Sequence, residues 1–172
     1  MSTIHVCPLS RLHDTVSACR ARRLVTLINN QTQVVRPETV AEPDHLFLGF
    51  NDISEPAEGL VLAGEDHVRR FLDFVGRWDQ EGPLVIHCWA GVSRSTAAAF
   101  TAVCALRPDL DEEEIAWRLR SRSPQASPNR RFVSLADEIL GREGRMNRAI
   151  ERIGRGADCF EGTVFSLSVS DD

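Results

Sequence analysis

The sequence contains no tyrosine, no apolar run of membrane-spanning length and no excess of basic residues. A spanning helix needs about 20 predominantly apolar residues, so we expect no transmembrane segment. The net charge of -5 opposes a surface built for nucleic acid, because such surfaces carry a basic excess. Residues 1–5 also lack the basic start and apolar stretch of a signal peptide. We therefore expect a cytoplasmic protein that has neither nucleic acid nor a membrane as its partner.

Cysteine patterns that would indicate disulfides or zinc are missing as well. The cysteines are odd in number and widely spaced, they include no Cys-x-x-Cys pair, and the histidines form no ligand pattern beside them. This usage fits a reduced, intracellular chain. We therefore expect no metal and no cofactor. Any one of the five cysteines could be a nucleophile: Cys7, Cys19, Cys88, Cys104 and Cys159.

Four short segments predict the strands of a sheet in a chain whose 172 residues suit one domain. The apolar run of residues 24–28 predicts a buried strand, and the β-branched run of residues 84–86 indicates a central parallel strand. Ile4 with Val6, and residues 45–50, predict two more. Beyond Gly156 the chain either frays or adds an edge strand at residues 163–165.

Helical patterns dominate the second half of the sequence. Asp111 followed by Glu114 is a capping-box pattern, and Ser127 before Pro128 places a capping residue ahead of a first-turn proline. The arginines of residues 142–155 alternate with glutamates, which indicates a solvated helix face. We expect helices at about residues 11–20, 68–78, 94–107, 111–121, 128–140 and 145–153.

This order of elements predicts an α/β domain with a helical C-terminal half. The central, mostly parallel sheet should have about four to five strands flanked by helices. We expect the domain to cover residues 1–156 and residues 157–172 to form a C-terminal tail. Loops at the carboxyl ends of parallel strands form the ligand site in such sheets, and two such loops follow Phe50 and His87.

The loop after the predicted central strand has the composition of an anion cradle. Gly91 permits a positive φ, so the backbone can curl into a nest of N–H groups, and the following helix adds its positive end. The planar fork of Arg94 can hold two oxygens of a tetrahedral oxyanion. The residues expected to bind phosphate are Trp89, Ala90, Gly91, Val92, Ser93 and Arg94.

Cys88 is placed to act as the nucleophile. A thiol at a helix N-terminus near a cation is commonly ionised at neutral pH, so we expect Cys88 to attack phosphorus and form a phosphocysteine intermediate. Ser95 could donate a hydrogen bond to the sulfur, and His87 orients the loop without acting as a base. A lone cysteine is more often a packing residue. The fixed register of His, Cys, Gly, Arg and Ser between a strand and a helix favours the catalytic interpretation.

The segment HCWAGVSRS resembles the signature loop His-Cys-x5-Arg-Ser/Thr of the protein-tyrosine phosphatases. It is most similar to the dual-specificity branch, in a compact, bacterial-type member. Ser127-Pro128-Asn129 followed by Phe132 and Leu135 is similar to the helix that supports the loop in that branch. The resemblance spans about residues 20–141. It implies a phosphotyrosine phosphatase-like fold and a contact between Asn129 and the signature loop.

The leaving oxygen needs a proton, which the family supplies from an aspartate on a loop upstream of the nucleophile. The loop after Phe50 leaves the same sheet edge as the cysteine loop, and its sequence Gly-Phe-Asn-Asp-x-x-x-Pro is similar to the acid loop of compact members. We therefore predict Asp52 as the general acid, and as the base for the attacking water. An aspartate after a strand is also a common turn residue. Three carboxylates remain competitors: Asp44, Glu55 and Glu58.

The missing tyrosine bears on the substrate. Tyrosine-specific members recognise the substrate ring with a tyrosine-bearing loop, so the resemblance implies a shallower pocket here. We expect a hydrolase of phosphorylated protein, acting on phosphotyrosine, with phosphoserine and phosphothreonine as further candidates. Phosphate, sulfate and vanadate should bind the loop as oxyanion inhibitors. The signature loop has no lysine, which weakens a phosphoinositide assignment.

Three other functions stay open. One is a phosphatase of a non-protein phosphomonoester, and another is a catalytically weak phosphate-binding module, which failure of Asp52 would favour. The third is a sulfurtransferase of the rhodanese type, against which the Arg94-Ser95 ending and the Asp52 loop count. The oligomeric state has no signature in the sequence.

Overall fold

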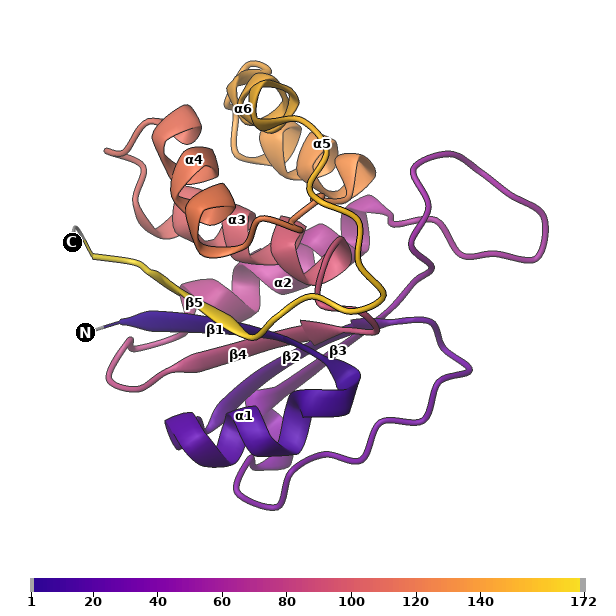
Figure 1. Ribbon diagram of the computed structural model, residues 1–172, viewed down its shortest axis with the longest axis vertical. Helices are drawn as coiled ribbons and strands as arrows, with labels where there is room; N and C mark the ends of the chain where they lie inside the picture. Colours follow the sequence, from indigo (N-terminus) through magenta and orange to yellow (C-terminus); the bar gives the residue numbers. More distant parts are fainter. Residues whose placement is uncertain (1, 171–172) are drawn as a thin grey trace.

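The computed structural model describes residues 2–170, in which five strands form one sheet. The strands are β1 Thr3–Pro8, β2 Arg23–Ile28, β3 His45–Gly49, β4 Leu84–Cys88 and β5 Phe165–Ser168. Their order is β3-β2-β4-β1-β5, with β1 to β4 parallel and β5 antiparallel to β1 (Figure 1). Strand β4 lies at the centre, and all five of its residues are buried. The predicted α/β class is confirmed.

Helices cover both faces of the sheet. In Figure 1, α1 lies on one face and the other α-helices lie on the opposite face. Helix α3 is buried along almost its whole length between the sheet and its neighbours, which explains why its sequence is apolar on all sides. The helices are η1 Leu9–Arg11, α1 Leu12–Cys19, η2 Glu42–Asp44, α2 Glu65–Gly76, α3 Arg94–Leu106, α4 Glu112–Arg122, α5 Arg130–Ile139 and α6 Arg145–Ile153. No helix within residues 2–170 is long and apolar enough to cross a membrane.

The apolar side chains form two cores, one on each face of the sheet, because successive residues of a strand point to opposite faces. Leu84 and Ile86 of β4 join the large core beneath α3, whereas Val85 faces the smaller core beneath α1. Successive side chains of a strand point to opposite faces, so a strand buried on both sides reads as a continuous apolar run. This is the pattern that β4 presents in the sequence.

The cap of α5 differs from the prediction. Asn129, not Ser127, caps this helix, since its Oδ1 accepts a hydrogen bond of 2.9 Å from the Phe132 N–H. Ser127 lies two residues too early to reach that amide, and its Oγ instead accepts from the Gly156 N–H at 2.9 Å. Asp111 caps α4 as predicted, accepting from the N–H groups of the second and third helical residues.

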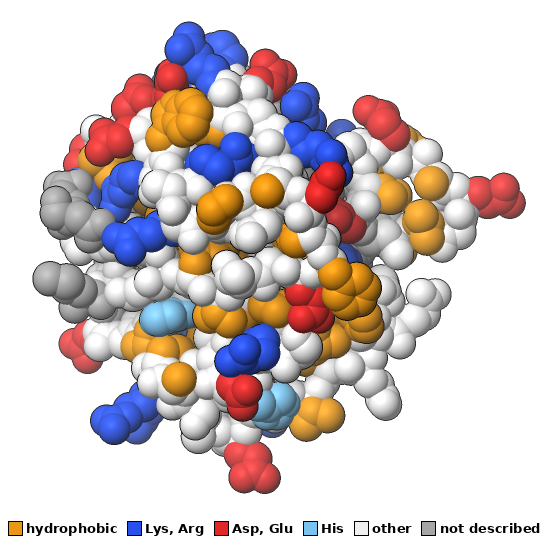
Figure 2. Space-filling model, viewed as in Figure 1, with side chains coloured by type: hydrophobic (Ala, Val, Ile, Leu, Met, Phe, Trp, Pro, Cys, Tyr) orange, Lys and Arg blue, Asp and Glu red, His pale blue; other side chains and the backbone are white. Residues whose placement is uncertain are grey.

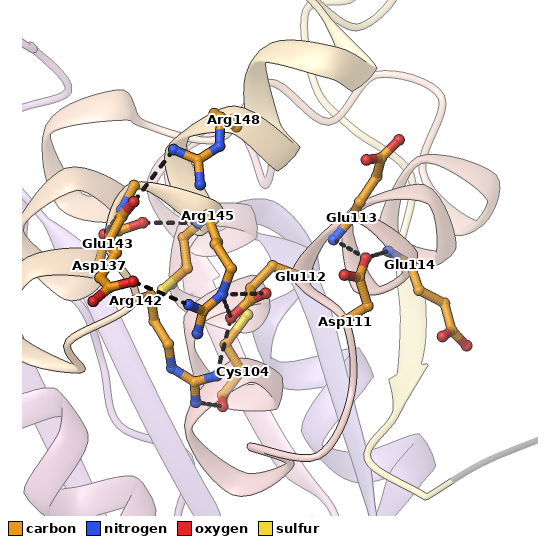
Figure 3. A network of polar contacts seen from close by, with 12 residues as sticks. Cys104, Asp111, Glu112, Glu113, Glu114, Asp137, Arg142, Glu143, Arg145 and Arg148 are labelled. Carbon is orange, nitrogen blue, oxygen red and sulfur yellow. Dashed lines mark hydrogen bonds and ion pairs between the residues drawn. The ribbon is translucent and has the colours of Figure 1, made fainter.

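The prediction of a solvated arginine face is wrong for Arg142. This side chain is buried, its Nη1 lies 3.0 Å from Glu112 Oε1, and its Nη2 donates to the Cys104 carbonyl at 2.6 Å (Figure 3). Arg145 approaches the same carboxylate, at 3.2 Å from Glu112 Oε2. Periodicity did not reveal this because Arg142 lies in the turn between α5 and α6, and Glu112 lies on α4, about thirty residues earlier in the sequence. The remaining arginines of the group are exposed, and Figure 2 shows basic and acidic side chains interspersed over the helical half of the molecule.

The C-terminal segment ends in an edge strand. After α6, residues 154–164 run without helix or strand past the connection between β4 and α3 (Figure 1). Strand β5 then pairs with β1 from Thr3↔Ser168 to Val6↔Phe165. Of the two alternatives for this segment, the edge strand is therefore the observed one, two residues later than expected.

Candidate active site

The loop between β4 and α3 begins at Cys88 and ends at Arg94, at the carboxyl edge of the central strand. Gly91 adopts a φ of +69°, the left-handed region that favours glycine. A Cβ at this position would also lie 2.8 Å from the Pro8 nitrogen and 2.9 Å from the Cys7 carbonyl carbon. Both the conformation and the close approach to β1 therefore require glycine.

The carbonyl oxygens of this loop point outward and are bound by neighbouring segments. Because the C=O and N–H of a trans peptide point in opposite directions, the N–H groups that follow these carbonyls face the inside of the loop. Within residues 2–170, no N–H of residues 89–93 donates to a backbone carbonyl. The result is a preorganised nest of donors. Four loop carbonyls accept hydrogen bonds from backbone N–H groups outside the loop: Trp89 from Leu9 at 3.0 Å, Ala90 from Gly162 at 2.8 Å, Val92 from Ser127 at 2.9 Å and Ser93 from Asn129 at 3.1 Å.

Cys88 lies inside this nest with its side chain almost fully buried. Its Sγ lies 3.1 Å from Ser95 Oγ and accepts a hydrogen bond of 3.2 Å from the Gly91 N–H. Both groups can stabilise negative charge on the sulfur. In contrast, burial raises the pKa of Cys7 to about 12 and also raises that of Cys104, so these two stay protonated at neutral pH.

Arg94 is anchored beneath the loop and has a buried donor without a partner among the described residues. The side chain is 7% exposed, and its Nη1 donates to the Phe50 carbonyl at 2.9 Å. Its Nε is buried and has no hydrogen-bond partner among the residues that the structure describes. A buried donor of a charged group is costly when it has no partner, so an anion bound in the loop would complete its hydrogen bonding.

His87 lies behind the loop in a chain of three side chains. Its Nδ1 is 3.1 Å from the Cys88 carbonyl and its Nε2 is 2.8 Å from Thr26 Oγ1, which is also 2.8 Å from His45 Nε2. A carbonyl only accepts, so Nδ1 carries the proton, the Thr26 hydroxyl donates to His87, and His45 donates to Thr26. Burial lowers the pKa of His87 to about 4. The ring is therefore neutral at pH 7 and supports the loop.

Asp52 is tied to the rim of the catalytic loop. Its Oδ1 accepts a hydrogen bond of 2.7 Å from Ser93 Oγ and one of 3.0 Å from Asn129 Nδ2, which also donates to the Ile53 carbonyl at 3.1 Å. Both bonds engage Oδ1, which leaves Oδ2 for proton transfer. The Asn129 side chain thus contacts the acid loop, whereas its backbone N–H contacts the signature loop.

The competing carboxylates lie elsewhere. Asp44 immediately precedes β3, at the opposite sheet edge from Cys88, and it faces Arg23 at 3.5 Å. Glu58 is exposed in the loop that follows Asp52. Glu55 lines a cavity of about 660 Å³ beside α5 and α6 that adjoins, through Ser54 and Arg130, the cavity lined by Asp52. Only Asp52 among the four is hydrogen-bonded to the catalytic loop.

Solved phosphatases have the same architecture. Cydia pomonella PTP-2 phosphatase is similar with a TM-score of 0.62 and 20% identity, covering 78% of this chain and 84% of its own. DUSP15 is similar with a TM-score of 0.63 and 16% identity, and the match covers 88% of this chain and 92% of DUSP15. Human DUSP28 is similar with a TM-score of 0.61 and 18% identity, and the match covers 81% of this chain and 94% of DUSP28. The chain has the dual-specificity phosphatase fold. At such identities the likeness concerns the fold, and neither a family model nor a curated protein matches the sequence.

Within this dual-specificity phosphatase fold, a cavity opens beside the catalytic loop. It measures about 390 Å³ and is lined by Asp52, Ser93, Asn129, Arg130 and Arg155, among others. Two of these residues are arginines from α5 and from the segment after α6. Among residues 2–170, no group of three or more His, Cys, Asp or Glu side chains is placed to hold a metal ion.

Two groups of residues behind the site escaped the sequence reasoning. Thr26 and His45 reach His87 because β2 pairs with both β4 and β3, a register that neither strand reveals alone. Gly162 reaches the loop through its backbone N–H, which leaves no side-chain signal. In this dual-specificity phosphatase fold, the signature loop is therefore supported by residues that lie far from it in the sequence.

Proposed function

We propose that this chain is a cysteine-dependent phosphatase that hydrolyses phosphomonoesters of phosphorylated proteins through a phosphocysteine intermediate. The observation that carries the proposal is the single loop that joins the Cys88 sulfur, inward N–H groups and the partnerless Nε of Arg94. Similar solved structures include phosphatases, which supports it.

The first step transfers the phosphoryl group to sulfur. The Cys88 thiolate attacks phosphorus, an S–P bond forms, and the P–O bond to the leaving group breaks. Loop N–H groups and Arg94 bind the equatorial oxygens, whose charge they stabilise in the transition state. Asp52 starts protonated and gives its proton to the leaving oxygen.

The second step releases inorganic phosphate. Asp52, now a carboxylate, accepts a proton from water as the water oxygen attacks phosphorus. The S–P bond breaks, and the sulfur leaves as a thiolate that accepts hydrogen bonds from Ser95 Oγ and the Gly91 N–H. Asp52 is again protonated, so the cycle closes without a metal or cofactor in the scheme.

The substrate class follows from the rim of the loop. Trp89 is half exposed beside the phosphate nest, where its ring can contact a peptide or a phosphorylated ring. We propose phosphotyrosine, phosphoserine and phosphothreonine in proteins as substrates, and phosphate, sulfate and vanadate as inhibitors. One similar structure is a mouse protein complexed with zinc tungstate. A thiolate nucleophile requires reducing conditions, so we place this activity in the cytoplasm.

Two alternatives are ranked by specific observations. PTPMT1 in complex with PI(5)P has this fold, with a TM-score of 0.57 and 15% identity, which keeps a phosphorylated lipid as the second candidate. The present chain has no lysine to contact such a headgroup. A phosphate-binding module without catalysis is disfavoured because Asp52 is held against the loop by Ser93 and Asn129.

Hydrolysis of p-nitrophenyl phosphate in the presence of chelator tests the proposal. The wild type should turn over, Cys88→Ser should lose all measurable activity, and Cys159→Ser, at an exposed thiol, should match the wild type. Activity that survives Cys88→Ser would remove the sulfur from the mechanism. Tight vanadate binding without turnover would favour the binding module. Comparison of a phosphopeptide with PI(5)P vesicles then separates the two substrate classes.

A further inference from the structure

The C-terminal strap, residues 154–164, runs along the outside of the catalytic loop and is anchored at both ends. At its start, Arg120 Nη2 donates to the Gly154 carbonyl at 2.8 Å, and the Ala157 N–H donates to the Pro124 carbonyl at 2.9 Å. At its end, β5 pairs with β1, the strand next to β4. In Figure 1 the yellow-orange chain descends from α6, passes the connection between β4 and α3, and turns into β5.

Two glycines of the strap approach the loop region closely: a Cβ on Gly156 would have no space, and a Cβ on Gly162 would fit only if its neighbours shifted by a few tenths of an ångström. A Cβ on Gly156 would lie 2.4 Å from the Gln125 carbonyl carbon and oxygen. A Cβ on Gly162 would lie 3.0 Å from the Gly91 carbonyl oxygen and 3.2 Å from Val92 Cγ2. Neither glycine is among those with a positive φ. It is the contact, and not the backbone conformation, that needs glycine here.

The peptide unit between Ala90 and Gly91 connects the strap to the nucleophile. On its outer edge, the Ala90 carbonyl accepts a hydrogen bond of 2.8 Å from the Gly162 N–H. On its inner edge, the Gly91 N–H donates to Cys88 Sγ at 3.2 Å. The unit is planar and trans, so a hydrogen bond that fixes one edge also sets the direction of the other. The strap thereby aims a donor at the reacting sulfur.

Strand β1 also lies against this part of the loop. Gly91 lies against the backbone of Cys7 and Pro8, whose atoms a Cβ would meet at 2.8 to 2.9 Å. The residue before Gly162 is tied to the segment after β1, since Glu161 Oε2 accepts a hydrogen bond of 2.9 Å from Ser10 Oγ. The strap and β1 therefore clamp the loop at the residue that faces the sulfur.

We propose that Gly162 is a positioning residue for the nucleophile: its N–H fixes the 90–91 peptide, which holds the Gly91 N–H on Cys88 Sγ. The C-terminal strap is accordingly a working part of the phosphatase domain. The proposal rests on the proposed function only in that Cys88 is the nucleophile. Its direct readout is the reactivity of the sulfur, which does not depend on Asp52 or on turnover.

The test compares Gly162→Ala with Gly82→Ala, a matched control whose added methyl group meets no atom within 4 Å. The rate of Cys88 alkylation by iodoacetamide at pH 7 is followed by peptide mass spectrometry, beside kcat and KM for p-nitrophenyl phosphate. The methyl group at residue 162 pushes the strap away from the Gly91 oxygen and loosens the 90–91 peptide. We expect slower alkylation and a kcat lowered about tenfold, with little change in KM.

A second variant keeps the test decisive if Gly162→Ala does not fold. Ser10→Ala releases Glu161 without adding volume and should lower the alkylation rate and kcat about twofold, with an unchanged thermal midpoint. If Gly162→Ala folds, the proposal is overturned when both variants match Gly82→Ala in alkylation and kcat. If it does not fold, Ser10→Ala alone overturns the proposal by matching Gly82→Ala in both. A different result separates the two proposals. If the wild type does not hydrolyse p-nitrophenyl phosphate but Gly162→Ala is still alkylated more slowly than Gly82→Ala, the proposed function is contradicted and the positioning role of Gly162 stands.

Discussion

Ser93 Oγ donates a hydrogen bond of 2.7 Å to Asp52 Oδ1, so the loop of residues 88–94 directly holds the carboxylate proposed as the general acid. Asn129 Nδ2 donates to the same oxygen at 3.0 Å. The loop that carries Asp52 begins at Phe50, whose carbonyl accepts from Arg94. Two hydrogen bonds therefore join the loop of residues 88–94 directly to the loop of Asp52, and Asn129 bridges the two loops through its side chain and its backbone N–H.

Replacement of Asp52 by asparagine tests its role as the acid. General acid catalysis contributes about 10²–10⁴-fold, so Asp52→Asn should lower kcat by that order on phenyl phosphate. On p-nitrophenyl phosphate the loss should be smaller, because nitrophenolate leaves without a proton. Glu55→Gln is the control, since Glu55 is an exposed carboxylate of the same loop that does not line the cavity of Asp52. If Asp52→Asn lowers kcat equally on both substrates, or if Glu55→Gln lowers it more, Asp52 is not the general acid.

Asn129 allows the support of the acid to be separated from the support of the helix. Asn129→Asp keeps an oxygen that accepts from the Phe132 N–H and so keeps the cap of α5. It replaces the amide that donates to Asp52 Oδ1 by an oxygen that cannot donate as a carboxylate, so Asp52 loses this hydrogen bond. We expect a lower kcat with nearly unchanged stability at pH 7. In Asn129→Ala, loss of the cap should add about 1 kcal/mol of destabilisation, measured by urea unfolding. A kcat that is unchanged in both variants would contradict the assigned support.

Much of the fold and the centre of the site could be predicted because their signals are local. Residues 84–86 form an unbroken apolar run, and the structure buries this strand on both faces. Cys88 and Arg94 stand in one short loop whose sequence alone suggests an anion nest. Asp52 could be proposed because the carboxyl ends of parallel strands meet at one edge. Its hydrogen bonds with Ser93 and Asn129 were not visible in any local pattern.

The features that escaped prediction depend on contacts between distant segments. Arg142 looks like a solvated arginine until Glu112, on another helix, is brought to 3.0 Å from it. Ser127 precedes a proline as a cap would, yet the folded chain turns its hydroxyl toward Gly156. Gly162 acts through a backbone N–H, which every non-proline residue possesses. Tertiary packing decides each of these, and composition or periodicity carries no information about it.

The stability of the protein should fall on acidification because His87 is buried as a neutral ring. Burial lowers its pKa to about 4 in the folded state from 6.5, so the unfolded chain binds the proton first. Above pH 6.5 His87 is neutral in both the folded and the unfolded chain, so it costs no stability there. As the pH falls from 6.5 to 4, proton binding to the unfolded chain lowers the free energy of unfolding. The difference corresponds to about 3 kcal/mol.

Urea unfolding of the wild type and His87→Asn at pH 7.5 and 5 measures this dependence. His87→Asn should be less stable at pH 7.5 and should lose less stability between the two pH values. His5, His45 and His67 also have pKa values lowered by burial, so part of the dependence should persist in the variant. Identical losses in both proteins would show that His87 is not the titrating group.

The buried ion pair between α4 and the turn after α5 should matter for stability and not for catalysis. Glu112→Gln leaves Arg142 as an uncompensated buried charge and should cost about 3–5 kcal/mol. Glu113→Gln is the matched control, because its pair with Arg152 at 3.2 Å is largely exposed and such pairs contribute about 0–1 kcal/mol. Thermal unfolding gives the comparison. Near-equal midpoints for the two variants would contradict the assignment, and kcat should stay unchanged in each folded variant.

The most direct test of the account is to find the phosphoryl group on Cys88. Asp52→Asn keeps the nucleophile but loses the base for water, so with p-nitrophenyl phosphate the intermediate should accumulate. Rapid quenching followed by peptide mass spectrometry should show one phosphoryl group on the peptide that contains Cys88, and none with the Cys88→Ser variant. Turnover by the wild type, with phosphate found on another residue or on none in Asp52→Asn, would contradict the phosphocysteine mechanism.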